Sequence, residues 1–299
     1  MAYLTMLNEM MAADLEQAVH QIKGLGIRYL DLKSHIFGHA IEDLDGESRE
    51  RLVALMEHTG MEVYCLSSVL GHQRVDIIGQ DRFRANLLQG MENLLETARI
   101  VRPTMIRLLA CCLAPRSDGG NHHIRLERES PWVYDVYREV IDLAAGAGMS
   151  VTIENEPDSI FSSPAETLGF FERLNAGSKA RYTWDIQNMW QSGVYPTLEV
   201  YRQLKPIINY VHLKGGRGLP GTPAILAYRS LLEEASWPVR EITQQVLQDG
   251  ISPIICLNTS HGMLAEDDIL APLKGTAELA AEEAYRNVVF LRRTYKEVV

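Results

Sequence analysis

The sequence predicts an α/β fold in which one domain, residues 1–299, forms a closed (β/α)8 barrel, or TIM barrel. Eight short runs of apolar and β-branched residues alternate with stretches of helical periodicity, the pattern of parallel strands joined by right-handed crossovers. The chain also has the length that eight such units require. An open, doubly wound sheet is the competing arrangement, and no linker divides the chain.

The first half of the chain supplies four of the β-favouring runs, at residues 4–7, 27–32, 62–67 and 104–109. Apolar residues recur every three to four positions over 13–23, which predicts a helix with one buried face. Further helices are expected around 52–56 and over 83–98. Gly24, Gly60 and Pro103 end these helices, because glycine and proline interrupt helical hydrogen bonding.

The second half repeats the scheme, with strands expected at residues 150–154, 182–185, 207–213 and 254–257. The helices between and after them are expected at 133–147, 165–174, 198–204, 230–234, 241–248 and 277–295. Gly148 ends the first of these helices. The last helix could cover the barrel or form a contact between two copies of the chain, so a homo-oligomer is possible.

The composition is that of an average soluble protein, with a net charge of −10 and a pI near 5.4. An acidic surface disfavours nucleic acid and anionic membranes as partners. No apolar run is long enough to span a membrane, and the N-terminal residues do not resemble a secretory signal. The four cysteines form no CxxC pair and suit a reducing compartment. We therefore expect a cytoplasmic protein.

The stretch at 151–157 carries the strongest functional signal. Its β-favouring residues lead into Glu154, Asn155 and Glu156, and Pro157 ends the strand. Because strand side chains alternate, the two glutamates should point to one side. Two buried carboxylates require a positive group between them, and a divalent metal is the simplest one. Two solvated acids in a loop are the alternative.

Polar residues also stand at the ends of the next three expected strands. Asp185, His212 and Asn258 each follow a β-rich run, as Glu154 does. In a closed parallel barrel these four side chains would meet at one rim. This oxygen and nitrogen set suits one divalent ion, Mn²⁺ first and Mg²⁺, Co²⁺ or Zn²⁺ as alternatives. Taken singly, the residues could instead be a helix N-cap, a core histidine and a turn former.

The sequence resembles the xylose isomerase-like TIM-barrel superfamily over nearly its whole length. The motifs that carry the resemblance are Ile-Glu-Asn-Glu-Pro at 153–157, Thr-Trp-Asp-Ile-Gln-Asn at 183–188, Tyr-Val-His-Leu-Lys at 210–214 and, more weakly, Cys-Leu-Asn-Thr-Ser-His at 256–261. This superfamily includes sugar isomerases and epimerases, hydroxypyruvate isomerase, inosose dehydratase and type IV apurinic endonucleases. Its members hold one divalent metal through Glu, Asp, His and Glu after strands five to eight. The resemblance maps the first three onto Glu154, Asp185 and His212.

Two positions depart from the family pattern. Asn258 stands where the family has the strand-eight Glu, and Asn188 replaces the His of a frequent D-x-x-H. The family's isomerases commonly move a proton beside a carbonyl, through a metal-stabilised enediolate, with the two glutamate ligands as acid and base. Asn258 cannot titrate near neutral pH, so a symmetric two-glutamate epimerase is disfavoured. The endonucleases need further histidines that cannot be placed here.

Several other residues could complete the site. The resemblance leaves Glu154 as a catalytic group, and Glu156 and Lys214 are candidates for the second acid or base. Lys214 could instead be an ordinary lysine at the rim. The candidate substrate-binding residues follow strands two, six, seven and eight: Lys33, His35, Asn188, Arg217 and His261. We expect Arg217 in a flexible loop, and His122 and His123 exposed in a polar loop after strand four.

These observations leave three functional hypotheses. The first is a divalent-metal-dependent isomerase or epimerase of a sugar or sugar-like polyol ketone. The second is a metal-dependent lyase or dehydratase of the same superfamily, which Asn258 makes more credible. The third is a barrel that binds a sugar without turnover.

Overall fold

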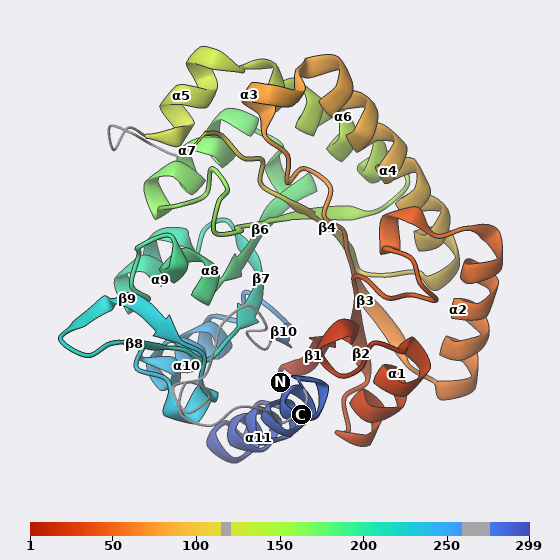
Figure 1. Cartoon of the computed structure of the whole chain (residues 1–299), viewed down its shortest axis with the longest axis vertical. Coiled ribbons are helices and arrows are strands. Elements are labelled where there is room, and N and C mark those ends of the chain that lie inside the picture. The colour runs from red at the N-terminus through yellow and green to blue at the C-terminus, as the bar shows by residue number, and fades with distance from the viewer. Residues whose placement is uncertain (115–120, 259–275) are drawn as a thin grey trace.

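The computed structural model describes residues 1–114, 121–258 and 276–299. In that part of the chain, parallel strands close into a barrel in the order β1-β10-β7-β6-β5-β4-β3-β2, with the helices around it (Figure 1). The predicted (β/α)8 barrel is therefore confirmed. The barrel strands are β1 (Tyr3–Leu7), β2 (Tyr29–Leu32), β3 (Glu62–Ser67), β4 (Met105–Leu109), β5 (Ser150–Glu154), β6 (Ala180–Asp185), β7 (Ile208–Leu213) and β10 (Ile254–Leu257).

The helices begin where short polar side chains cap them. Asp14, Asp45, Ser163 and Thr197 each accept a hydrogen bond from a backbone N–H in the first turn of the helix that follows. The helices of the described chain are α1 (Leu15–Gly24), α2 (Gly46–Thr59), α3 (Val75–Ile78), α4 (Gln80–Val101), α5 (His122–Glu129), α6 (Trp132–Gly146), α7 (Pro164–Leu174), α8 (Ile186–Gln191), α9 (Leu198–Leu204), α10 (Val239–Asp249) and α11 (Thr276–Thr294).

The hydrophobic core lies between the strands and the surrounding helices. Trp184 on β6 is fully buried and stacks on Tyr201 of α9, with ring centroids 6.0 Å apart. Trp184 therefore points away from the barrel interior, unlike its neighbour Asp185. The two ends of the chain lie side by side (Figure 1), and the N–H of Val299 donates to the carbonyl of Ala2 over 3.0 Å. None of the helices in the described ranges has the length and apolar character needed to cross a bilayer.

Two local expectations were wrong, and a third was right only in part. Arg217 opens an antiparallel hairpin, β8 (Arg217–Leu219) and β9 (Thr222–Tyr228), which extends from the barrel beside α8 (Figure 1). Its strands lack alternating apolar residues, and Gly221, with φ 79°, supplies the turn. Asn121 caps α5, so His122 is the first residue of that helix. The side chain of His122 is buried. Only a short 3-10 helix, Leu232–Glu234, forms within 230–234.

Candidate metal centre and active site

Strand register brings the three expected metal ligands to one rim of the barrel. Asp185 on β6 lies opposite His212 on β7, and Glu154 ends the neighbouring strand β5. The backbone N–H of Asn258 then donates to the carbonyl of Leu213, which places Asn258 beside the end of β7. Parallel strands end at the same edge, so residues far apart in the sequence become neighbours here.

Glu154, Asp185 and His212 each offer a ligand atom, and these atoms all lie within 4.8 Å of one another. Nδ1 of His212 is 2.9 Å from Oε1 of Glu154 and 3.8 Å from Oδ2 of Asp185. All three side chains are at most 1% exposed. One ion could therefore contact two carboxylates and one imidazole at the same time, a donor set typical of Mn²⁺, Mg²⁺ or Zn²⁺.

Asn258 lies at the same place and leaves an acceptor atom without a partner. Its Nδ2 is 3.4 Å from Oδ2 of Asp185 and 3.5 Å from Nδ1 of His212. Its Oδ1 is buried and has no hydrogen-bond partner among residues 1–114, 121–258 and 276–299. A buried oxygen without a donor costs free energy, and a cation between these residues would satisfy it. The donor set thus fits a divalent ion with Asn258 as a neutral fourth ligand.

Arg107 is a site residue to which the sequence assigned no role. It lies on β4, is 1% exposed, and pairs with Oε2 of Glu154 while its NH2 donates to the carbonyl of Ser68 over 3.0 Å. Burial alone would raise the pKa of Glu154, but Arg107, followed by His212 and Lys214, holds that pKa well below its usual range. Glu154 is therefore kept ionised, as a metal ligand must be.

Lys214 follows His212 by two residues and faces the same cluster. Its Nζ is 2.8 Å from Oδ2 of Asp185 and 2.9 Å from Oδ1 of Asn188. Burial opposes the charged form, but Asp185, Glu156 and Glu154 outweigh it and raise the pKa of Lys214. Lys214 is thus a buried, charged group inside the site, unlike a lysine that extends from the rim into solvent.

Glu156 is partly buried next to these groups. Its Oε2 accepts a hydrogen bond from Nδ2 of Asn188 over 3.2 Å. Burial, followed by the nearby charge of Glu154, raises the pKa of Glu156. The two glutamates therefore differ in chemistry, because one is held ionised and the other binds a proton more readily. This arrangement can provide both a ligand and a proton-transfer group.

Asp31 is a second residue to which the sequence assigned no role. Its Oδ2 lies 3.8 Å from Nε2 of His212 and accepts a hydrogen bond of 3.0 Å from the hydroxyl of Tyr210. Asp31, His212 and Cys256 also have potential ligand atoms within 4.8 Å of one another. This second group is the weaker candidate for a metal, since burial raises the pKa of the Cys256 thiol and disfavours the thiolate.

The cluster as a whole carries an excess of negative charge. It contains four carboxylates and two permanent cations: Asp31, Glu154, Glu156, Asp185, Arg107 and Lys214. If all of them are ionised and His212 is neutral, as a metal-binding imidazole must be, two negative charges remain without compensation, and a divalent cation would balance them. Without the ion, protons supply the compensation. Burial opposes the charged form of His212, but Glu154 outweighs it and raises the pKa of His212 well above its ordinary value, and burial raises the pKa of Asp31.

The structure does not bring all the candidate substrate-binding residues to this cluster. Asn188 lies within it through Glu156 and Lys214. Lys33 instead pairs with Oε1 of Glu9 over 2.9 Å, while His35 and Arg217 are exposed to solvent. His261 lies outside the described residues.

Comparison with known proteins gives a family match and several structural neighbours. Residues 19–259 match the family model described as xylose isomerase-like TIM barrel. No curated protein matches the sequence. A probable 3-DHS dehydratase, AsbF from Bacillus anthracis, is 17% identical over 98% of this chain and 99% of its own, with a TM-score of 0.69.

Two further solved structures have the same fold. D-psicose 3-epimerase from Clostridium cellulolyticum H10, solved with D-tagatose, is 14% identical over 98% of this chain and 99% of its own, with a TM-score of 0.69. A xylose isomerase-like TIM barrel protein from Mycobacterium smegmatis, in complex with magnesium, is 15% identical over 93% of this chain and 88% of its own, with a TM-score of 0.65.

Proposed function

Since the chain belongs to the xylose isomerase-like TIM barrel family, we propose that it is a divalent-metal-dependent isomerase or epimerase of a sugar or sugar-like polyol ketone. The observation that carries this proposal is the cluster of Glu154, Asp185 and His212, whose ligand atoms lie within 4.8 Å of one another. The sugar epimerase and the magnesium complex among the structural neighbours support it.

Each group of the cluster receives a role in this proposal. Glu154, Asp185 and His212 would hold the ion, with Oδ1 of Asn258 as a fourth donor. When bound, the ion would act as a Lewis acid on a substrate carbonyl. Glu156 would take up or return the proton on the carbon beside that carbonyl. Lys214 would donate a hydrogen bond to a substrate oxygen and keep Asp185 oriented.

The main experiment measures proton exchange. The purified protein is first stripped with EDTA and then reconstituted with Mn²⁺, Mg²⁺, Co²⁺ or Zn²⁺. Each form is incubated with a panel of ketoses in deuterated water, and deuterium at the carbon beside the carbonyl is followed by NMR. We expect exchange only with metal, with Glu154→Gln losing the metal and Glu156→Gln keeping the metal but losing exchange. Exchange that persists in the stripped protein would contradict the proposal.

A lyase or dehydratase is the second candidate. Asn258 follows β10 where the family pattern has an acid, so among the described residues the end of β10 brings no titratable side chain to Asp185. A single base suits proton abstraction followed by loss of a β-substituent better than a symmetric epimerisation. The dehydratase among the neighbours supports this alternative. Loss of water or another leaving group from the substrate in the same NMR experiment would identify it.

A further inference from the structure

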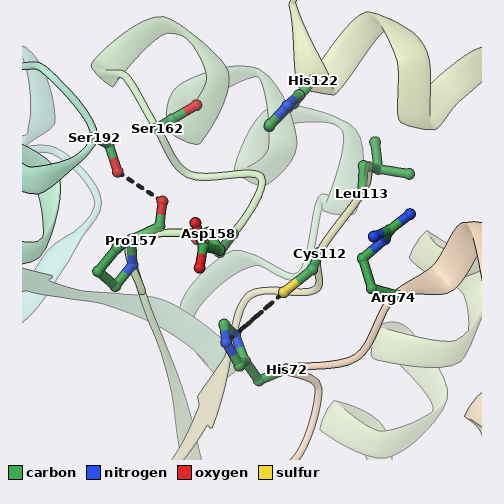
Figure 2. Close-up of a pocket in the computed structure, with 10 residues that line it drawn as sticks. His72, Arg74, Cys112, Leu113, His122, Pro157, Asp158, Ser162 and Ser192 are labelled. Carbon is green, nitrogen blue, oxygen red and sulfur yellow. Dashed lines mark hydrogen bonds between the residues drawn. The ribbon is translucent and has the colours of Figure 1, made fainter. Parts of the chain in front are cut away.

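A cavity of about 550 Å³ lies beside the turn that follows Glu156, within the roughly 300–1,000 Å³ of ordinary small-molecule sites. Loops after β3, β4 and β5 surround it, together with the starts of α5 and of the loop after α8 (Figure 2). Its polar lining residues are His72, Arg74, Cys112, His122, Asp158, Ser159, Ser162 and Ser192, and Leu113 and Pro157 provide apolar surface.

One stretch of the chain connects the proposed active site to the cavity. Pro157, Asp158 and Ser159 line it and directly follow Glu156. The hydroxyl of Ser159 donates to the carbonyl of Glu156 over 2.7 Å, which fixes this turn. Glu156 is also near enough to Cys112 for its charge to contribute to the raised pKa of that thiol, although burial is the larger cause. A ligand in the cavity would therefore extend from the position where Glu156 acts.

The charges around the cavity do not suit an anion. Arg74 is already neutralised, because Asp76 accepts from its Nε over 2.7 Å and from its NH2 over 2.6 Å. Asp158, by contrast, is exposed and has no ion pair among the described residues, so it adds a negative charge. Burial lowers the pKa of His72 and favours its neutral form. A phosphate or carboxylate here would meet no spare cation from the described residues.

The remaining groups suit hydroxyls. In Figure 2 Asp158 lies across the cavity from His72 and Cys112, with Ser162 and Ser192 on the side of Pro157. The hydroxyls of Ser159, Ser162 and Ser192 already donate within the protein, to the Glu156 carbonyl, to Oε2 of Glu166 and to the Pro157 carbonyl. Their oxygens and the Asp158 carboxylate can therefore accept from sugar hydroxyl groups, and the imidazole N–H of His72 can donate to them. Leu113 and Pro157 would cover the apolar face of a ring. The combination is polar without being cationic.

We propose that this cavity binds an uncharged, hydroxyl-bearing group attached to the reacting sugar, such as a second sugar ring, and that it discriminates against phosphorylated substrates. The inference rests on the proposed function, because it assigns the distal part of the same substrate. Asp158 is then a specificity-determining residue, which binds hydroxyls and repels anions.

The test measures binding alone. Titration calorimetry on Mn²⁺-loaded protein compares three probes: D-fructose, D-fructose 6-phosphate and lactulose, in which a galactosyl ring is attached to fructose. We expect lactulose to bind about tenfold more tightly than fructose, and the phosphate to bind no more tightly than fructose. Equal affinities for lactulose and fructose, a preference for the phosphate, or no binding of any probe would overturn the inference.

Two variants with the same change in charge sharpen the test. Asp158→Lys should weaken lactulose binding and tighten fructose 6-phosphate binding about tenfold, because it replaces the anion by a cation. Asp135→Lys, at a position on α6 whose side chain is 72% exposed, should leave all three affinities unchanged. Identical behaviour of the two variants would also overturn the inference. Since no turnover is needed, failure of the proton-exchange experiment would not affect this ranking.

Discussion

The ammonium group of Lys214 lies 2.8 Å from Oδ2 of Asp185, a carboxylate in the proposed metal centre. The same ammonium donates to Oδ1 of Asn188, and the backbone N–H of Asn188 donates to Oδ1 of Asp185 over 2.9 Å. Asp185 is thus held on both oxygens before any ion binds. A metal at this place must share Asp185 with a permanent cation, so Lys214 should set the affinity of the site as well as contact the substrate.

Replacing Lys214 by Met should therefore tighten Mn²⁺ binding by about tenfold, because it removes a positive charge a few ångströms from the ion. The same variant should lose most of its proton exchange, since the substrate oxygen loses its donor. Titration calorimetry measures the affinity, and Lys205→Met, which breaks the surface pair with Asp249, serves as the charge-matched control. Weaker Mn²⁺ binding in the Lys214 variant would instead mean that Lys214 mainly orients Asp185.

Asn258 provides a second test of the metal centre. Asn258→Asp keeps the shape of the side chain and adds a negative charge next to Asp185 and His212, so Mn²⁺ should bind about tenfold more tightly. Asn258→Ala removes the unpartnered Oδ1 and should weaken binding by a similar factor. An affinity that is the same in all three proteins would show that Asn258 lies outside the coordination sphere. Metal content after gel filtration provides an independent readout.

The sequence was sufficient to predict the positions that depend on strand topology alone. Glu154 and Asp185 end their strands and His212 lies one residue before the end of β7, and closure of the barrel makes those ends neighbours whatever the details of packing. The fold was predictable as well, because the periodicity of apolar residues marks each strand and helix, and glycine and proline mark where the helices end. Roles for these residues do not follow from topology and remain proposals.

Contacts across the barrel interior could not be predicted in this way. Arg107 and Asp31 face inward from β4 and β2, and Tyr210 reaches Asp31 over 179 positions in the sequence. A strand pattern does not predict which inward-facing side chains contact each other. The lone arginine within the apolar run 105–109 did indicate a buried charge, which requires a partner of opposite charge. The hairpin at 217–228 was missed because its residues do not alternate between apolar and polar.

Asp31 should act through the orientation of His212. With Nδ1 turned to the ion, Nε2 of His212 is 3.8 Å from Oδ2 of Asp31, which is longer than a hydrogen bond. A small rotation of the ring on metal binding would bring Nε2–H within hydrogen-bond distance of this carboxylate, which would then fix the metal-binding imidazole. Asp31→Asn should weaken Mn²⁺ binding about 10- to 100-fold. Imidazole ¹⁵N NMR of the metal-free protein should also show that a smaller fraction of His212 carries a proton on Nε2. Tyr210→Phe, which keeps the carboxylate, should have a smaller effect on both measurements.

The raised pKa of Glu156 predicts a pH-dependent stability in the metal-free protein. Its pKa lies above the ordinary 4.5, chiefly because of burial and then because of Glu154. The folded state thus favours protonated Glu156, and this contribution is complete below pH 4.5 and is lost as pH rises through the folded-state pKa. Glu156→Gln removes the titration and keeps an acceptor for Asn188, so it should be increasingly stabilising, relative to wild type, as pH rises.

Urea unfolding in EDTA, followed by circular dichroism from pH 4 to pH 8, measures this difference. The free energy of unfolding of Glu156→Gln minus that of wild type should be smallest at the acid end and increase with pH, with a slope no steeper than about 1.4 kcal/mol per pH unit, the limit for one proton. A difference that does not change with pH would show that Glu156 is ionised without cost in the folded protein. Adding Mn²⁺ should reduce the dependence, because the ion compensates the neighbouring charge of Glu154.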